Sequence, residues 1–409
     1  MKNSTRKLQD KPRDEGPRRR LRLVVVFTSS VSVAFYFGLY GYLQNRGIDV
    51  SVISSEGPEL ETARDEGASV FAVPMQREIS PGRDLISLWR LWRVIRKIRP
   101  DVINVGTPKA GLLGGLAGFL ARVPHRVYTL HGLRLETTHG LKRALLTYSE
   151  RLACYCAHSV HCVSPSLLRL ALELKLVEPG KAVLIGPGTS RGVDVAHLQP
   201  SSETCRNAIA LRRDLGIPDD APVVGFVGRF TRDKGIPELY QAFVSLKEKY
   251  RNMRLLLVGD FETGDPVPDD IRIAIEADQS VIRTGFISDV APYYHLMDLC
   301  VLATYREGFP GVPLEAQAAG VPVITTRATG AIDSVLDQQT GVIVPVGDQN
   351  ALSAAMDRLL GDSFLRKRMG EAGRAWVDST FQREVVWAAH AEEYEQLASR
   401  ETGEQLCVL

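Results

Sequence analysis

Short runs of β-branched and other apolar residues alternate with longer segments of helical periodicity along almost the whole chain. These runs are residues 49–54, 68–74, 101–106, 125–131, 159–165 and 182–187 in the first half, and 222–230, 253–260, 280–286, 299–304, 322–326 and 341–345 in the second. Strands that are apolar throughout and separated by helices are typical of parallel sheets covered on both faces. The pattern therefore predicts an α/β protein with two doubly wound, Rossmann-like parallel sheets.

Between the two sets of runs, around residues 190–220, the chain is rich in turn-forming residues and has little strand character. We place the domain boundary there. The predicted parts are a basic tail (1–20), a first domain (21–195), a second domain (196–385) and a C-terminal helix that returns to the first domain (386–409). Ligands bind beyond the carboxyl ends of parallel strands, so two facing sheets predict a site in the cleft between them.

Residues 23–43 form an uncharged run as long as a membrane-spanning helix, and four arginines lie within residues 18–22 before it. A signal peptide fits poorly, because no small-residue cleavage site closes the run. The run divides instead into a strand, a turn and a helix over residues 33–47, and we favour this interpretation because the same alternation continues down the chain. A membrane anchor is the alternative.

Composition supports a globular protein of two domains, with 44% hydrophobic and 24% charged residues. Its six cysteines have no regular spacing, which suits a reducing compartment better than a disulfide framework. Residues 1–22 contain nine Lys or Arg and three Asp or Glu, although the net charge of the chain is only +2. We expect this tail to be disordered, either as a solvated leader or in contact with an acidic membrane surface.

Two cations follow the first strand of the second domain. Arg229 and Lys234 lie between this strand and a helix expected to begin near Pro237. A helix N-terminus favours phosphate oxygens, Arg offers a planar fork and Lys a mobile point charge, so the pair suits a diphosphate, although the segment could also be a simple turn. It lacks the second glycine and the Ser/Thr of an ATP-binding P-loop, and residues 186–192 lack the dinucleotide-binding spacing, which disfavours an ATPase and a dehydrogenase.

Two acidic residues, Glu307 and Glu315, lie eight positions apart around a loop of glycines and prolines. Pro313 suits the first turn of a helix and puts Glu315 inside that turn, and Gly308 to Gly311 leave backbone N–H groups accessible to a ligand. Carboxylates accept hydrogen bonds from neighbouring hydroxyls, so one acid could hold a ribose and the other a hexose. Alternatively, both acids only stabilise the N-terminus of the helix.

These four charged residues together resemble the signature of retaining glycosyltransferases of family 4, which have the GT-B fold. Residues 107–137, 192–194 and 328–335 are similar to the bacterial branch of that family, which builds capsule, exopolysaccharide and lipid-linked O-antigen or glycan units. The resemblance covers nearly the whole chain after the basic tail. It implies two Rossmann-like domains that face each other across a cleft.

The resemblance also implies roles for individual residues. Arg229 and Lys234 would bind the diphosphate of a nucleotide sugar, Glu315 the ribose hydroxyls, and Glu307 the donor sugar. His131 matches the family's histidine near the sugar and the acceptor, although a lone histidine after a strand is more often structural. These assignments make His131, Arg229, Lys234 and Glu307 the candidate catalytic residues. The donor site would also include Gly285, Phe286, Gly308, Phe309, Pro310, Gly311 and Val312.

The chain departs from the family after its first strand, where many members have a Gly-Gly loop and residues 28–35 read TSSVSVAF. Ser29 and Ser32 could supply the missing diphosphate contacts. Lys109 and Arg77 are candidates for binding an acceptor pyrophosphate.

The reaction that the resemblance implies is a hexosyl transfer with retention at the anomeric carbon, without a metal or other cofactor. The donor would be a nucleotide sugar, most simply a UDP-sugar, and the acceptor a lipid-linked (polyprenyl diphosphate) saccharide. We expect a cytoplasmic protein, peripheral on the inner face of the plasma membrane, with no nucleic-acid partner. The alternatives are a nucleotide-sugar epimerase or hydrolase of the same fold, and a non-catalytic two-domain sugar-binding protein, which would need export.

The segment CYCAHSVHC, residues 154–162, invites comparison with a zinc site. Cys154 and Cys156 lie two apart on an expected helix and would face different ways, and no second pair of ligands follows. We therefore predict no metal site.

Overall fold

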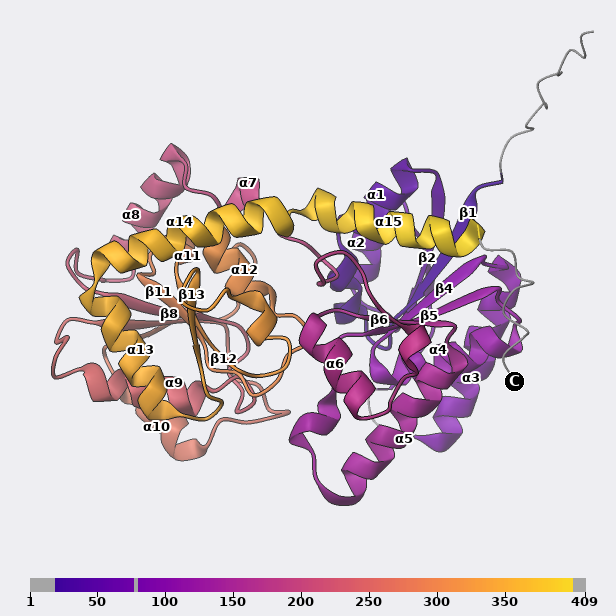
Figure 1. The fold of residues 1–409 in the computed structure, drawn as a ribbon, viewed down its shortest axis with the longest axis horizontal. Helices are drawn as coiled ribbons and strands as arrows, with labels where there is room; N and C mark the ends of the chain where they lie inside the picture. Colours follow the sequence, from indigo (N-terminus) through magenta and orange to yellow (C-terminus); the bar gives the residue numbers. More distant parts are fainter. Residues whose placement is uncertain (1–18, 77–79, 400–409) are drawn as a thin grey trace, which may run out of the picture.

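The computed structural model describes residues 19–76 and 80–399, which form two parallel sheets side by side along the long axis of the molecule (Figure 1). Most of the predicted tail, residues 1–18, lies outside the described residues, as do Arg77 and residues 400–409. Each of the predicted apolar runs contains a strand, so the predicted fold class is confirmed.

The first sheet has seven parallel strands in the order β3-β2-β1-β4-β5-β6-β7. Their bounds are β1 (Leu21–Val26), β2 (Ile48–Ser54), β3 (Ser69–Ala72), β4 (Val102–Gly106), β5 (His125–Leu130), β6 (Ser159–Cys162) and β7 (Ala182–Leu184). The second sheet has six parallel strands in the order β10-β9-β8-β11-β12-β13. Their bounds are β8 (Val223–Val227), β9 (Arg254–Val258), β10 (Val281–Arg283), β11 (Leu299–Leu302), β12 (Val323–Thr326) and β13 (Gly341–Val344). The segment between β7 and β8 contains the proposed domain boundary.

Helices cover both faces of the first sheet, as buried apolar strands require. One face packs against α1 (Leu39–Asn45), α2 (Glu59–Asp65) and α15 (Arg383–Ser399), and the other against α3 (Pro81–Ile98), α4 (Pro108–Leu120), α5 (Gly140–Cys156) and α6 (Pro165–Glu173). Helix α4 lies between α3 and α5 and contacts both (Figure 1). Its glycines allow a close approach to the sheet, because a Cβ at Gly111 would lie 2.4 Å from the Tyr128 ring.

The second sheet is covered in the same way. One face packs against α9 (Ile236–Leu246), α10 (Asp269–Ala277) and α13 (Gln349–Gly361), and the other against α8 (Ser202–Asp214), α11 (Ala291–Tyr294), α12 (Gly311–Ala318) and α14 (Ser363–Thr380). The remaining short elements are η1 (Ser30–Tyr36), η2 (Arg134–Thr137), η3 (Pro179–Lys181), η4 (Ile332–Ser334) and α7 (Val195–Leu198).

The apolar run over residues 23–43 forms parts of β1, η1 and α1, as the favoured interpretation predicted. The single helix expected over residues 33–47 was wrong in detail. Gly38, with φ +85°, separates η1 from α1, and a Cβ at this position would lie 2.4 Å from the ring of Trp387. Within the described ranges, no helix is both long and apolar enough to cross a bilayer.

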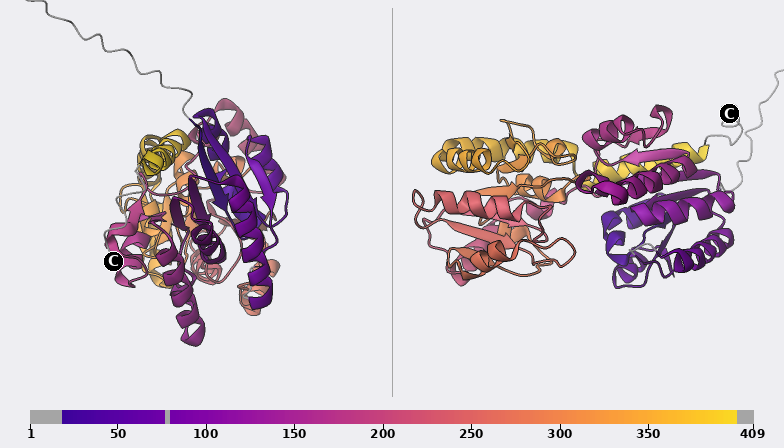
Figure 2. Two further views of the ribbon diagram at one scale, coloured as in Figure 1. Left: turned by 90° about the vertical axis from the view of Figure 1, so that its right-hand side faces the viewer. Right: turned by 90° about the horizontal axis from the view of Figure 1, so that it is seen from below.

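The last two helices connect the domains. Helix α14 packs on the second domain, and α15 then runs across to the first (Figures 1 and 2). The side-chain amide of Asn104, in the middle of the first sheet, donates a 2.7 Å hydrogen bond to the Tyr394 hydroxyl of α15. Both residues are buried, so this contact fixes α15 on its sheet from inside the core.

Candidate active site

The first predicted cation, Arg229, lies in the loop after β8, with a side chain that is 67% exposed and pairs with Glu262. Gly228, which precedes Arg229, packs against Gly259 in the loop after β9. A Cβ at Gly259 would lie 1.9 Å from the Gly228 carbonyl oxygen, so these two backbones can meet only at glycine. The guanidinium is therefore presented to solvent from a fixed backbone.

The second cation, Lys234, pairs with the first predicted acid. Its Nζ lies 2.5 Å from Oε1 of Glu307, and the two side chains are 23% and 12% exposed. The Lys234 loop is anchored to the end of β11, because the Thr304 hydroxyl donates to the Asp233 carbonyl (3.0 Å) and the Tyr305 N–H donates to the same oxygen (2.8 Å). Lys234 and Glu307, 73 positions apart in the sequence, thus meet at the carboxyl ends of β8 and β11.

Glu315 lies on α12, which begins at Gly311, so the acid starts the second helical turn and not the first turn as predicted. Its side chain points back toward the helix N-terminus, with Oε1 3.7 Å from where a Cβ of Gly311 would lie. The Tyr294 hydroxyl donates a 2.9 Å hydrogen bond to Oε2. Burial, and next the Glu315 charge, raise the pKa of Tyr294, so this phenol stays a hydrogen-bond donor.

The Glu307 loop also forms a close backbone contact between the domains, where Gly308 meets His131 and Gly132. A Cβ at Gly308 would lie 2.3 Å from the carbonyl oxygen of His131, and one at Gly132 would lie 3.1 Å from the Gly308 nitrogen. On the other side, a Cβ at Gly330 would lie 2.3 Å from the Gly308 carbonyl oxygen. The two domains therefore approach to backbone contact beside the Lys234–Glu307 pair.

His131 itself follows β5 and packs in an aromatic cluster, with its ring 4.8 Å from that of Phe35. Its Nδ1 lies 3.3 Å from the Ser190 hydroxyl, and within the described part of the chain its buried Nε2 has no hydrogen-bond partner. Burial, and next the positive charge of His390, lower the pKa of His131 to about 3. The imidazole is therefore neutral at physiological pH and keeps one ring nitrogen unpaired.

Two of the other predicted donor-site residues, Gly285 and Phe286, follow the edge strand β10, and the rest belong to the Glu307 loop and the start of α12. Gly285 has a positive φ (+71°) after β10, and the Phe286 side chain beside it is largely exposed. Phe309 packs against the cores of both domains, so its side chain serves the domain contact. Pro310 is buried and caps α12, Gly311 is exposed, and Val312 is half-buried against the second core.

Two of the residues predicted to bind further phosphates, Ser32 and Lys109, contact neighbouring protein groups in the structure. Ser32 donates its N–H to the Ser29 carbonyl (3.0 Å) inside η1. The Lys109 ammonium lies 2.7 Å from Asp84 of α3, and both side chains are largely buried. Lys109 is therefore part of the packing between α3 and α4 at the carboxyl edge of the first sheet.

The prediction missed charged residues at the domain contact, among them Arg306 and Glu136. Arg306 donates to the Thr137 hydroxyl (2.9 Å) and lies 2.6 Å from Asp233. Glu136 accepts a 2.6 Å hydrogen bond from the Thr329 hydroxyl at Oε2, while its buried Oε1 has no partner among residues 19–76 and 80–399. Burial raises the pKa of this carboxyl. Arg306 lies beside Glu307 in the sequence, and this adjacency was the available signal.

The cysteines of residues 154–162 are buried in the first core, and burial raises the pKa of each of their thiols. His158 lies 2.7 Å from Arg126, on the other side of this segment from the core. In the part of the chain that the structure describes, no three His, Cys, Asp or Glu side chains form a group suited to a metal ion.

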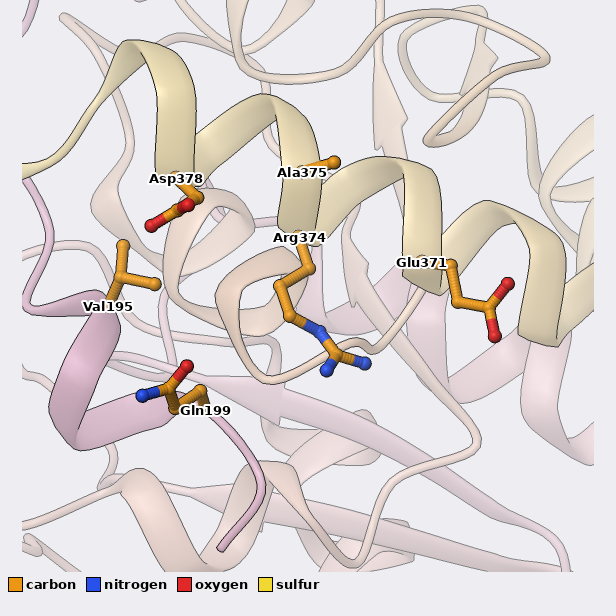
Figure 3. A pocket seen from close by; sticks show the side chains of 6 residues that line it. All are labelled: Val195, Gln199, Glu371, Arg374, Ala375 and Asp378. Carbon is orange, nitrogen blue, oxygen red and sulfur yellow. The ribbon is translucent and has the colours of Figure 1, made fainter.

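A pocket of about 320 Å³ lies outside this region, between α7 and α14 (Figure 3). Its lining residues are Val195, Gln199, Glu371, Arg374, Ala375 and Asp378. None of them belongs to the predicted site, and the Arg374 guanidinium extends into the space between the two helices.

Both domains match known protein families. The family described as "Glycosyl transferases group 1" matches residues 207–376, and the "Glycosyl transferase 4-like domain" matches residues 37–188. The capsular polysaccharide biosynthesis glycosyltransferase CapM of Staphylococcus aureus is 36% identical over 360 residues, which is 88% of this chain and 93% of CapM. The chain therefore belongs to the family of glycosyltransferases that these two descriptions and CapM represent. The two family matches lie on either side of the proposed domain boundary. The match over residues 207–376 contains Arg229, Lys234, Glu307 and Glu315.

Two further similarities extend over most of the glycosyltransferase. An Escherichia coli UDP-Gal:alpha-D-GlcNAc-diphosphoundecaprenol alpha-1,3-galactosyltransferase is 26% identical over 79% of this chain and 83% of its own length. Among solved structures, Anabaena Alr3699/HepE in complex with UDP-glucose superposes with a TM-score of 0.78 at 20% identity, over 92% of this chain and all of that one. At this identity the superposition establishes the GT-B fold.

Proposed function

We propose that this glycosyltransferase transfers a hexose, with retention of anomeric configuration, from a UDP-sugar to a lipid-linked saccharide during synthesis of a bacterial surface polysaccharide. The observation that carries the proposal is the Lys234–Glu307 pair, which lies at the carboxyl ends of two strands beside the domain contact. A cation and a carboxylate at one point suit a ligand with a diphosphate and a polyhydroxyl sugar.

The names of the relatives support the substrate classes. CapM is named for capsular polysaccharide biosynthesis, and the E. coli relative for a UDP-Gal donor and a diphosphoundecaprenol acceptor. A Campylobacter jejuni relative, 25% identical over 80% of this chain, is likewise named for transfer to a diphospho-undecaprenol saccharide. These names favour a UDP-sugar donor and a polyprenyl diphosphate acceptor. We propose that an enzyme with such an acceptor works at the cytoplasmic face of a membrane.

In the proposed reaction the acceptor hydroxyl oxygen forms a bond to the anomeric carbon, and the bond from this carbon to the diphosphate oxygen breaks. The acceptor proton passes to the departing diphosphate, on the same face of the sugar. Negative charge grows on the diphosphate as its bond breaks, so Arg229 and Lys234 bind the transition state more tightly than the ground state. Because these cations supply the charge stabilisation, we expect activity to persist in EDTA.

Glu307 and Glu315 have different roles in this proposal. Glu315, already accepting from Tyr294, has a second oxygen for a ribose hydroxyl. Glu307 exchanges part of its contact with Lys234 for donor-sugar hydroxyls when the diphosphate binds the lysine. The neutral His131 offers its unpaired Nε2 to a sugar or acceptor hydroxyl, and its pKa of about 3 keeps it uncharged during the reaction.

The test begins with a screen of UDP-, GDP-, ADP- and dTDP-sugars for protection of the purified protein against heating. We expect one UDP-sugar to protect, because a ligand at a hundred times its Kd stabilises by about 2.7 kcal/mol. That donor, radiolabelled, is then incubated with membrane lipid extracts, and label should enter the lipid fraction only with the active enzyme. NMR of the product should show the anomeric configuration of the donor.

Other outcomes would contradict the proposal. Release of UDP at the same rate with and without acceptor would indicate a hydrolase, and interconversion of the sugar alone an epimerase. Binding of free sugars without binding of any nucleotide would indicate a sugar-binding protein.

A further inference from the structure

Helix α3 exposes large apolar side chains on one face. Leu85, Ile86 and Trp89 are 68%, 52% and 53% exposed, and positions i, i+1 and i+4 share one side of a helix. The opposite side, with Leu91 and Ile95, is fully buried against the first sheet. Exposed residues of this size in a contiguous group mark an interaction surface, since single ones are ordinary but groups are rare.

Helix α5 has the same property. Leu141, Leu145 and Tyr148 are 87%, 47% and 68% exposed, and their spacing of i, i+4 and i+7 again puts them on one face. Ala153 and Cys156, at the other end of this helix, are buried in the core. We call these six residues, three on α3 and three on α5, the apolar rim.

The exposed charged side chains of α3 and α5, which border the apolar rim, are all basic. The described side chains of α3 and α5 include just two carboxylates, Asp84, which pairs with Lys109, and Glu150, which is buried. The basic residues on the same two helices are exposed: Arg83, Arg90, Arg93, Arg96, Lys97, Lys142, Arg143 and Arg151. Arginine also lies over both tryptophans of α3, 5.5 Å above Trp89 and 5.0 Å above Trp92. Apolar side chains bordered by basic ones suit the interface of an anionic bilayer.

The helices that carry the apolar rim begin near the contact between the domains. Helices α3 and α5 pack on either side of α4 on one face of the sheet, with Lys109 in the first turn of α4 (Figure 1). Helix α5 begins three residues after η2, whose Glu136 and Thr137 contact the second domain at Thr329 and Arg306. The first turns of both α3 and α5 therefore lie on the carboxyl side of the first sheet, which is also the side of the domain contact.

We propose that α3 and α5 dock the enzyme on the surface of an anionic bilayer, with the apolar rim in the headgroup region. This inference rests on the proposed function, because a bilayer-embedded acceptor gives the docking its purpose. Docked in this way, the acceptor side of the cleft faces the membrane, and a polyprenyl-linked saccharide enters without its lipid leaving the bilayer. The second domain, which binds a water-soluble donor, exposes its large apolar residues singly, for example Ile209 on α8 and Ile273 on α10.

The experiment is co-sedimentation of the full chain with vesicles of phosphatidylcholine alone or with 30% phosphatidylglycerol. Two test variants each remove apolar residues from one helix, L85S/W89S and L141S/L145S, and a third, K142A/R143A, removes charge. The matched control is I273S/F364S, which replaces exposed apolar residues of the second domain. Thermal unfolding with and without the protecting UDP-sugar tests whether each variant is folded and binds donor.

We expect the wild type to prefer the phosphatidylglycerol vesicles. Each apolar double variant should bind them at least tenfold more weakly, K142A/R143A should lose about fivefold per charge, and the control should bind like the wild type. Tryptophan emission of the wild type should shift to the blue on anionic vesicles, and W89F should lose most of this shift because Trp89 is the exposed tryptophan on the rim.

Wild-type vesicle affinity in both apolar double variants would overturn the inference, as would a wild type that binds neither vesicle. Dissociation of a dimer by these variants, seen in sedimentation velocity, would show that the rim binds a second copy instead. Vesicle binding could fail while the UDP-sugar still protects the enzyme and transfer to a detergent-dispersed acceptor persists. In that case the inferred membrane docking is wrong and the proposed function stands. If vesicles bind but no donor protects, the proposed function fails instead.

Discussion

The two domains have the same parallel architecture but hold their charged and apolar groups differently. The first domain buries titratable groups such as Glu150 and His161 and exposes the apolar rim. The second keeps several charges of its predicted site on loops, where they form ion pairs, as in Arg229–Glu262 and Lys234–Glu307. Paired loop charges can exchange partners with a charged, water-soluble ligand, whereas an exposed apolar face suits an amphiphilic one. In the proposed reaction, one fold therefore serves two substrates of opposite character.

The strongest test of this contrast is Arg229→Ala in the second domain. The side chain is 67% exposed, so loss of its pair with Glu262 should change the free energy of unfolding by less than about 1 kcal/mol. Turnover should fall about 10²–10³-fold, because the cation acts on charge that develops in the transition state. Steady-state kinetics and thermal unfolding measure the two effects.

Arg272→Ala is the matched control, since Arg272 forms an exposed pair with Glu276 on α10, at 3.1 Å. It should leave both turnover and stability close to wild type. Equal turnover in the two variants would mean that Arg229 does not act in the reaction.

The contact where the two domains meet can be broken with Gly308→Ala. The new Cβ would lie 2.3 Å from the His131 carbonyl oxygen, so the domains must separate or the loop must shift, at a cost of about 1–3 kcal/mol. We expect at least a tenfold loss of turnover and a larger radius of gyration by small-angle scattering. In the control Gly264→Ala the new Cβ meets Glu262 at an ordinary 3.5 Å, and an equal effect there would contradict the interdomain explanation.

The smallest expected effect on turnover concerns Glu150, the buried acid of the first domain. Burial raises the pKa of Glu150 from 4.5 to about 7, while the Tyr128 hydroxyl donates to it at 2.7 Å. Between pH 4.5 and 7 the folded state therefore binds more protons than the unfolded state, so this group's stabilising contribution is present below pH 4.5 and is lost as pH rises through 7.

Glu150→Gln keeps an acceptor for Tyr128 and removes the titration. Relative to wild type, this variant should gain about 3 kcal/mol of stability between pH 4.5 and 8, since each unit of pKa difference contributes about 1.4 kcal/mol, measured by urea unfolding at both values. Glu203→Gln, at an exposed position on α8, should show no such change. A constant difference between variant and wild type across this range would mean that Glu150 is not held protonated.

The sequence predicted the strands well, because apolar runs separated by helices permit few other architectures. The contact between Lys234 and Glu307 could be anticipated for a similar reason, since both residues follow strands of one parallel sheet. The break at Gly38 could not be predicted, because it depends on Trp387, almost 350 residues further along the chain. The contacts of Glu136 were missed likewise, since Thr329 reaches it across the domain interface.

The crossing of α15 has a consequence for synthesis on the ribosome. Ala391, Tyr394 and Leu397 complete a core whose other members come from the first hundred or so residues. A nascent chain that has emerged as far as α14 therefore has the part of this face that α15 covers still open to water, and translation at about 5–20 residues per second leaves it so while the second domain is made. The N-terminal domain begins folding first but finishes last, so chaperones that bind apolar surface should hold it until the chain is released.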